Sequence, residues 1–171
     1  MGKLVQVSNE TVTSAVSTVT LTGINDNSNY IVTVRNVVPT TNARIFYIRF
    51  TNGGTAITTS NYNRAVKTLL ATTTFPDASD QNASEIRVED LGNDTGEVAN
   101  GILHLYNFND ASEYSFANAR WSISDQVNGR LLGGQGGYIL ESEQSCDGLQ
   151  FYLESSDTFA SGQFVLYKVV T

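Results

Sequence analysis

The chain has 171 residues, of which 40% are hydrophobic and only 16% are charged, and its formal net charge is -7. This length suits one domain over 1–171 that buries a core without disulfides or metals. The negative charge disfavours nucleic acid, which needs a cationic surface. No apolar run approaches a membrane span of about 18 residues, and the N-terminus lacks the pattern of a signal peptide. The single cysteine, Cys146, excludes an intramolecular disulfide.

Apolar and polar residues alternate in short bursts through the first third of the chain. A period of two is typical of half-buried β-strands, and the interruptions are rich in Gly, Asn and Asp, which favour turns. In the last of these bursts, Phe46, Ile48 and Phe50 share one face, so we expect them to point into a core. The strands expected here are 5–7, 16–21, 30–34, which closes at 37–38 before a proline, and 43–51.

The polar segment 25–29, Asn-Asp-Asn-Ser-Asn, separates two of these strands. Its side-chain oxygens are of the kind that calcium accepts, but it lacks the spacing and the closing Glu of an EF-hand loop. We therefore favour a β-turn over a calcium site, and we expect no metal or other cofactor.

Two segments in the middle of the chain lack clear alternation. The stretch 61–71 could form a short helix, because Tyr62, Val66 and Leu69 fall on one helical stripe, but its threonine-rich surroundings favour a strand. The stretch 71–83 is polar and irregular, which predicts an exposed loop.

The C-terminal half contains more strand patterns and one glycine-rich run. The run at 133–137 lacks the Lys-Ser/Thr of a phosphate-binding loop, so we interpret it as a flexible connection between strands. The chain ends in the apolar stretch 164–170, which must be paired to be stable, and we place it deep within a sheet. About ten short strands separated by turns predict an all-β fold, a single antiparallel two-sheet sandwich. The further strands are expected near 62–70, 84–89, 100–108, 119–124, 137–141, 148–153 and 163–170.

Few side chains are suited to catalysis. His104 is the only histidine, and it lies on the strand face opposite its neighbouring leucines, as a surface residue does. With one histidine and one cysteine the chain cannot assemble the usual four-ligand zinc site, and no Gly-x-Ser-x-Gly elbow occurs. Glu141 and Glu143 could share a strand face like a glycosidase pair, but such adjacent carboxylates are usually solvated. We therefore expect no catalytic residue and no enzyme activity.

Carbohydrate binding is a further possibility, because sugars stack on exposed aromatic rings rimmed by Asn, Asp and Gln side chains. One of the available rings, Trp121, alternates with Arg120 and Ser122, and this pattern favours a buried core residue. The candidate glycan contacts are Trp121, Tyr62, Tyr106 and Tyr114, and Tyr138 is also available.

The most distinctive part of the sequence is its ending. Residues 148–153 read as an aromatic strand, and 160–167 continue with Ser-Gly, an apolar strand and Leu-Tyr. Together with 36–62 and 100–107, this ending is similar to that of small virion β-sandwich proteins of tailed bacteriophages. Where that family has Leu-Tyr-Gly, this chain has Leu-Tyr-Lys at 166–168, which departs from the pattern.

The resemblance implies a jelly-roll-like sandwich, association into a trimer or a higher symmetric assembly, and a place in the virion after assembly in the host bacterial cytoplasm. It carries over no functional residue. The chain has no long coiled-coil or β-helical shaft, so we expect a capsid decoration or cement protein that packs against the major capsid protein. The alternative is a tail or fibre-tip module that binds a host receptor or surface glycan. Position on the particle and copy number stay open.

Overall fold

The computed structural model describes residues 2–71, 75–125 and 130–170. Within these ranges the chain is all-β and antiparallel, as predicted, and the only helical element is a 3₁₀ turn, η1 (Glu154–Ser156). The ambiguous stretch 61–71 forms a strand and not a helix. The described residues form thirteen strands, more than the expected ten. Two of the unexpected strands, the short one at 55–56 and the polar one at 77–83, show no apolar alternation.

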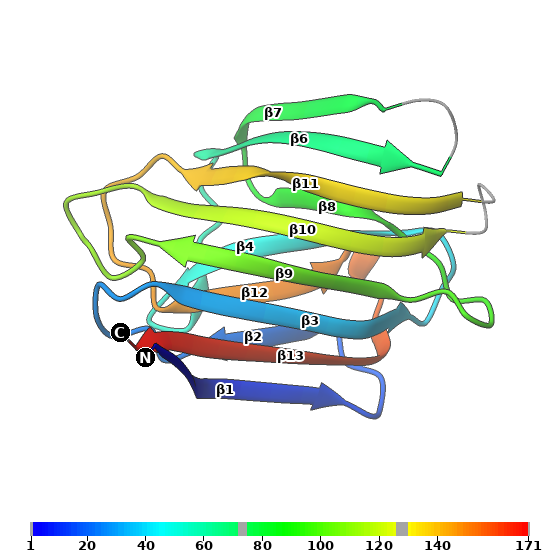
Figure 1. The fold of residues 1–171 in the computed structure, drawn as a ribbon, viewed down its shortest axis with the longest axis horizontal. Helices are drawn as coiled ribbons and strands as arrows, with labels where there is room; N and C mark the ends of the chain where they lie inside the picture. Colours follow the sequence, from blue (N-terminus) through cyan, green and yellow to red (C-terminus); the bar gives the residue numbers. More distant parts are fainter. Residues whose placement is uncertain (1, 72–74, 126–129, 171) are drawn as a thin grey trace.

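Two antiparallel sheets contain these strands, an arrangement consistent with a β-sandwich (Figure 1). In the order of the larger sheet, the strands are β1 (Lys3–Val12), β13 (Phe159–Val170), β3 (Tyr30–Pro39), β9 (Ala99–Tyr106), β10 (Ser115–Asp125), β11 (Arg130–Leu140), β6 (Tyr62–Leu70) and β7 (Asp77–Ala83). The smaller sheet has the order β2 (Thr18–Thr22), β12 (Gly148–Leu153), β4 (Arg44–Asn52) and β5 (Thr55–Ala56), and β8 (Ile86–Leu91) also pairs with β4.

The core lies between the two sheets and is rich in aromatic rings. The three residues expected on the core face of β4, Phe46, Ile48 and Phe50, are fully buried. The ring of Phe46 lies 5.7 Å from that of Trp121 on β10 and 5.8 Å from that of Phe159 on β13, in both cases edge to face. Edge-to-face pairs add about 0.5–1.5 kcal/mol each beyond the burial of apolar area. These contacts therefore fix how the smaller sheet sits on the larger one.

The glycine-rich run 133–137 is not a flexible connection, contrary to our expectation. It lies inside β11, which pairs with β10 on one side and with β6 on the other. A Cβ atom on Gly136 would lie 2.4 Å from Val66 Cγ1 and 2.5 Å from the carbonyl oxygen of Ala65. The strands β11 and β6 thus approach so closely that only glycine fits at this point.

The predicted exposed loop 71–83 is wrong for its second half, which forms the edge strand β7. Residues 72–74 lie outside the described residues. The strand is held to β6 by an ion pair between Asp77 and Lys67, at 2.6 Å, and by a second pair between Asp80 and Arg64. Because β7 covers little core, its sequence needs no apolar alternation, and charged side chains protect this edge from other strands.

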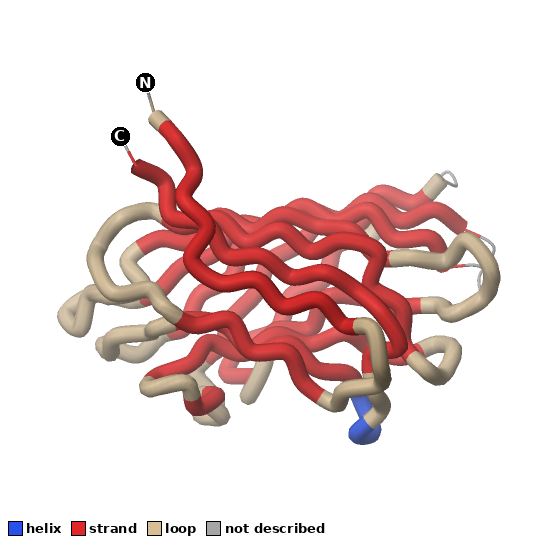
Figure 2. Tube along the Cα trace, turned by 90° about the horizontal axis from the view of Figure 1, so that it is seen from below, coloured by secondary structure: helices blue, strands red, loops and turns tan. Residues whose placement is uncertain are grey.

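The C-terminal strand β13 lies inside the larger sheet, as predicted, because it pairs with β1 on one side and β3 on the other. The terminal ends of β1 and β13 project together beyond the body of the molecule (Figure 2). Near this end, the carboxylate of Asp26 accepts hydrogen bonds from the Lys168 ammonium, from the Tyr30 hydroxyl at 2.9 Å and from the Ser28 N–H at 3.0 Å. The segment 25–29 therefore uses its one carboxylate, Asp26, to hold β13.

Candidate functional site

The outer face of the larger sheet, defined here as the side turned away from the smaller sheet, carries polar side chains at alternate positions of the central strands. On β9, Leu103 and Leu105 are buried in the core, while His104 between them is exposed on the outer face. On β10, Trp121 and Ala119 are buried, and Arg120 between them is exposed. The alternation that builds the core thus also sets the composition of the outer face.

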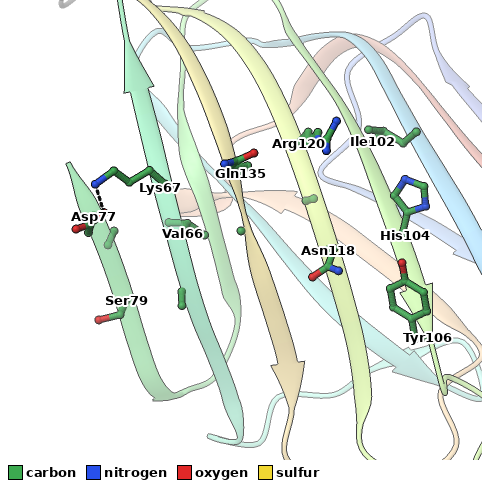
Figure 3. A pocket seen from close by; sticks show the side chains of 14 residues that line it. Val66, Lys67, Asp77, Ser79, Ile102, His104, Tyr106, Asn118, Arg120 and Gln135 are labelled. Atoms are coloured by element: carbon green, nitrogen blue, oxygen red, sulfur yellow. Dashed lines mark ion pairs between the residues drawn. The ribbon is translucent and has the colours of Figure 1, made fainter. Parts of the chain in front are cut away.

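This face is hollowed. The first hollow has a volume of about 930 Å³ and runs across β9, β10, β11, β6 and β7 (Figure 3). A second hollow of about 550 Å³ adjoins it toward β3 and β13, and the two share Ile102 and Arg120. A third, of about 390 Å³, shares Ala65, Ser79 and Asn118 with the first. The polar and aromatic side chains of the first hollow are Lys67, Asp77, Ser79, His104, Tyr106, Asn118, Arg120 and Gln135.

Two cross-strand rows explain the shape of the first hollow. The first row has long side chains: Asp77, Lys67, Gln135, Arg120 and Ile102 pair in succession from β7 to β9. The second row has short ones on the β7 side: Ser79, Ala65, Gly137, Asn118 and His104. Because serine, alanine and glycine fill so little space, the floor of the hollow is formed largely by the backbone of β6 and β11.

Two aromatic rings lie beside each other where the first hollow adjoins the third. Tyr106 on β9 lines the first hollow, and Phe116 on β10, which lines the third, pairs directly with it on the outer face. The Phe116 side chain is 39% exposed, a large fraction for a phenylalanine. Directly opposed residues on one sheet face lie about 4.5–5.5 Å apart at Cβ, so the pair forms a continuous apolar surface. Such a surface next to polar groups suits a ligand with both apolar and polar faces.

Two of the four predicted glycan contacts are buried in the core and are corrected here. Tyr62 is 1% exposed, and its hydroxyl donates to the Ile57 carbonyl at 3.0 Å and accepts from the Phe50 N–H at 2.9 Å. Trp121 is 5% exposed, and its indole lies where a Cβ on Gly101 would be, 2.1 Å from the ring carbon Cε3. Both side chains pack in the core, although Trp121 also borders the second hollow.

The other two predicted contacts lie at the surface. Tyr106 is half-buried and lines the first hollow. Tyr114 is 40% exposed in the loop before β10 and does not line any of the three hollows. Several lining residues were absent from the sequence prediction. For Phe116, Asn118 and Arg120 the signal was position, since each alternates with buried residues on β10, and Lys67 precedes the buried Thr68 on β6. Gln135 lies between two glycines and gave no such signal.

The histidine, cysteine and glutamate residues considered in the sequence lie in different environments. His104 is exposed on the outer face, whereas Cys146 is fully buried in the core, and the Ser115 hydroxyl contacts its sulfur at 3.4 Å. Burial raises the pKa of the Cys146 thiol to about 11. Glu141 and Glu143 lie in the loop after β11 and are both exposed. Across the ranges that the structure describes, no three His, Cys, Asp or Glu side chains gather in a way that could hold a metal ion.

Comparison of the chain with protein-family models, with curated proteins and with solved structures finds no match in any of the three. The similarity to phage virion proteins therefore stays a prediction. No helix among the described residues is both long and apolar enough to span a membrane.

Proposed function

We propose that the chain is a non-enzymatic recognition module that binds a carbohydrate on the outer face of its larger sheet. The observation that carries this proposal is the first hollow. Its volume of about 930 Å³ lies within the range of about 300–1,000 Å³ that is typical of small-molecule sites. It combines a few polar side chains with an aromatic surface, and its floor is the backbone of central strands.

The chemistry of the hollow fits a sugar. A pyranose ring has an apolar face of C–H groups and a rim of hydroxyls, so it pairs with an aromatic ring on one side and with hydrogen-bonding groups around it. Tyr106 in the first hollow and its cross-strand neighbour Phe116 in the adjoining third hollow supply the rings. Asn118 and Gln135 each offer both a donor and an acceptor, and Arg120 offers donors in a fixed plane.

The proposal includes a jelly-roll-like, two-sheet sandwich and a place in a tailed-phage virion, at a tail or fibre tip that meets host surface glycans. Between the two roles expected from the sequence, it favours the receptor-binding one. A decoration protein works through flat packing surfaces and needs no polar hollow, whereas a glycan-binding module does.

Binding to a panel of immobilised bacterial and plant polysaccharides, followed by titration calorimetry on the best binder, tests this function. Tyr106→Ala and Asn118→Ala should each weaken binding about tenfold or more, because both side chains line the hollow. Tyr114→Ala is the matched control, since it removes an exposed aromatic ring outside the hollows. Equal affinities for all three variants, or no binding to any polysaccharide in the panel, would contradict the proposal.

The second candidate is the capsid decoration role, and the edge strand β1 favours it. Unlike β7, this edge has few charges, and Leu4 and Val5 are 53% and 41% exposed. An unprotected edge is a template for strand pairing between copies, and a stable interface buries about 1,600 Å². Light scattering should then find a trimer that Val5→Lys dissociates and Tyr114→Lys does not. A monomer at all concentrations would remove this role.

A further inference from the structure

The permanent charges that line the first two hollows are opposite in sign to the net charge of the whole chain. The protein has 17 acidic against 10 basic residues. Yet the described residues that line the first two hollows include three permanent cations, Lys67, Arg120 and Arg35, and one carboxylate, Asp77. Asp77 is bound by Lys67 at 2.6 Å. Arg120 and Arg35 are thus left without a carboxylate partner among the described residues.

The fold holds these two arginines at opposite ends of a short path along the hollows. Arg120 on β10 pairs with Ile102 on β9, which pairs with Thr33 on β3, and Arg35 lies two residues beyond Thr33. From the spacing of strands and of residues along them, the two Cα atoms are about 12 Å apart. Arg35 is followed by a bulge at Asn36, whose N–H donates to the Asn100 side chain at 3.0 Å. The bulge sets the position of Arg35 relative to the neighbouring strand β9.

Aromatic residues accompany the two cations. Tyr106 lines the first hollow, four residues along β9 from Ile102, the partner of Arg120, and Tyr167 on β13 lines the second hollow with Arg35. The two hollows are continuous through Ile102 and Arg120, so one extended ligand can cross both. Each half of the path therefore offers one guanidinium, which binds a carboxylate in bidentate fashion, and one ring for a sugar face.

We infer that the ligand of the outer face is an acidic polysaccharide, whose sugar carboxylates bind Arg120 and Arg35. This inference rests on the proposed carbohydrate-binding function and names its ligand class. A nucleic acid is disfavoured, because it carries a phosphate at every nucleotide and would be repelled by a chain of net charge -7. A polysaccharide whose carboxylates are separated by neutral sugars has a lower charge density than a nucleic acid. Two arginines about 12 Å apart can pair with two such carboxylates.

The test compares hyaluronate and gellan, in which neutral sugars separate the carboxylated ones, with the same polymers after chemical reduction of their carboxyl groups to alcohols. Titration calorimetry in low salt measures the wild-type chain and the variants Arg120→Gln and Arg35→Gln. The control is Arg87→Gln on β8 of the smaller sheet, where the side chain is 38% exposed and pairs with Asp90. It changes the net charge equally but lies away from the hollows. Thermal unfolding of each variant checks that the fold is kept.

We expect the wild-type chain to bind at least one acidic polymer about tenfold or more tightly than its reduced form. Each hollow variant should lose about tenfold in affinity for it, as the loss of a charge-assisted hydrogen bond predicts, and Arg87→Gln should lose nothing. Equal binding of acidic and reduced polymers, with the arginine variants unaffected and Tyr106→Ala defective, would overturn the ligand class and leave the carbohydrate function standing. Binding of neither form would overturn both. Tighter binding of single-stranded poly(dT) at the same salt would show a nucleic-acid site instead.

Discussion

The close approach of β11 to β6 makes a quantitative prediction about Gly136. In Gly136→Ala the new methyl group would lie 2.5 Å from the Ala65 carbonyl oxygen and 2.7 Å from Val66 Cα. These are backbone atoms, so the clash cannot be relieved by rotating a side chain, and the two strands must separate. Overpacking of this kind costs about 1–3 kcal/mol, and the entropy lost from the unfolded chain returns about 0.4–1 kcal/mol. We expect a net loss of about 1–2 kcal/mol.

Gly134→Ala is the control on the same strand. A Cβ there would lie 3.7 Å from Trp121 Cβ and 3.8 Å from Trp121 Cδ1, which are ordinary contacts. This variant should be neutral or more stable by up to about 1 kcal/mol. Urea unfolding followed by the fluorescence of Trp121 measures both free energies, and the melting temperature of Gly136→Ala should fall by about 2–8 °C. Equal stability of the two alanine variants would refute the steric account of the glycine-rich strand.

Three further predictions concern the core and the charged turn. Tyr62→Phe leaves a backbone donor and acceptor unpaired in the core and should cost about 1–3 kcal/mol in urea unfolding, while Tyr106→Phe at the surface should change stability little. Because burial raises the pKa of Cys146 to about 11, a disulfide reagent at neutral pH should label it only after unfolding; immediate labelling would contradict its burial. The ion pair with Lys168 lowers the pKa of Asp26, so Asp26 stabilises the fold above its ordinary pKa of 3.8, and this contribution is lost as the pH falls below it. In Asp26→Asn the free energy of unfolding should depend less on pH in this acid range. An unchanged pH dependence would exclude the Asp26–Lys168 pair as its cause.

The sequence predicted the strands that bury one face, because burial on one side leaves a period of two. Phe46, Ile48 and Phe50 are the clearest example. It failed where that physical cause is absent. The edge strand β7 covers little core and therefore shows no alternation, and β11 replaces side chains with glycine where another strand comes too close. Glycine occurs both in turns and where two strands pack closely. A glycine-rich run therefore does not show by itself which of the two it forms.

For the candidate site, residue type was a weaker guide than position. Tyr62, Trp121 and Tyr106 are all aromatic, but only Tyr106 lies on the outer face. The alternation that placed His104 opposite its leucine neighbours also places Tyr106 there, two residues along the strand. The same rule assigns Trp121 to the core through its alternation with Arg120. Positions opposite a predicted core face would therefore have been better candidates than aromatic residues in general.

The charge pattern of the outer face follows from how the fold distributes its carboxylates. Most described acidic residues lie in loops, on the smaller sheet or on the edge strand β7, and the central strands of the larger sheet carry almost none on the outer face. These acidic positions are Asp26, Asp77, Asp80, Glu85, Glu89, Asp90, Asp94, Glu97, Asp110, Glu113, Glu141, Glu143, Asp147, Glu154 and Asp157. A net negative charge favours solubility, and we propose that the local excess of arginine guides an anionic ligand to one face. Since the hollows are built on the backbone of central strands, the arginines start from fixed positions, and less entropy is lost when the ligand binds.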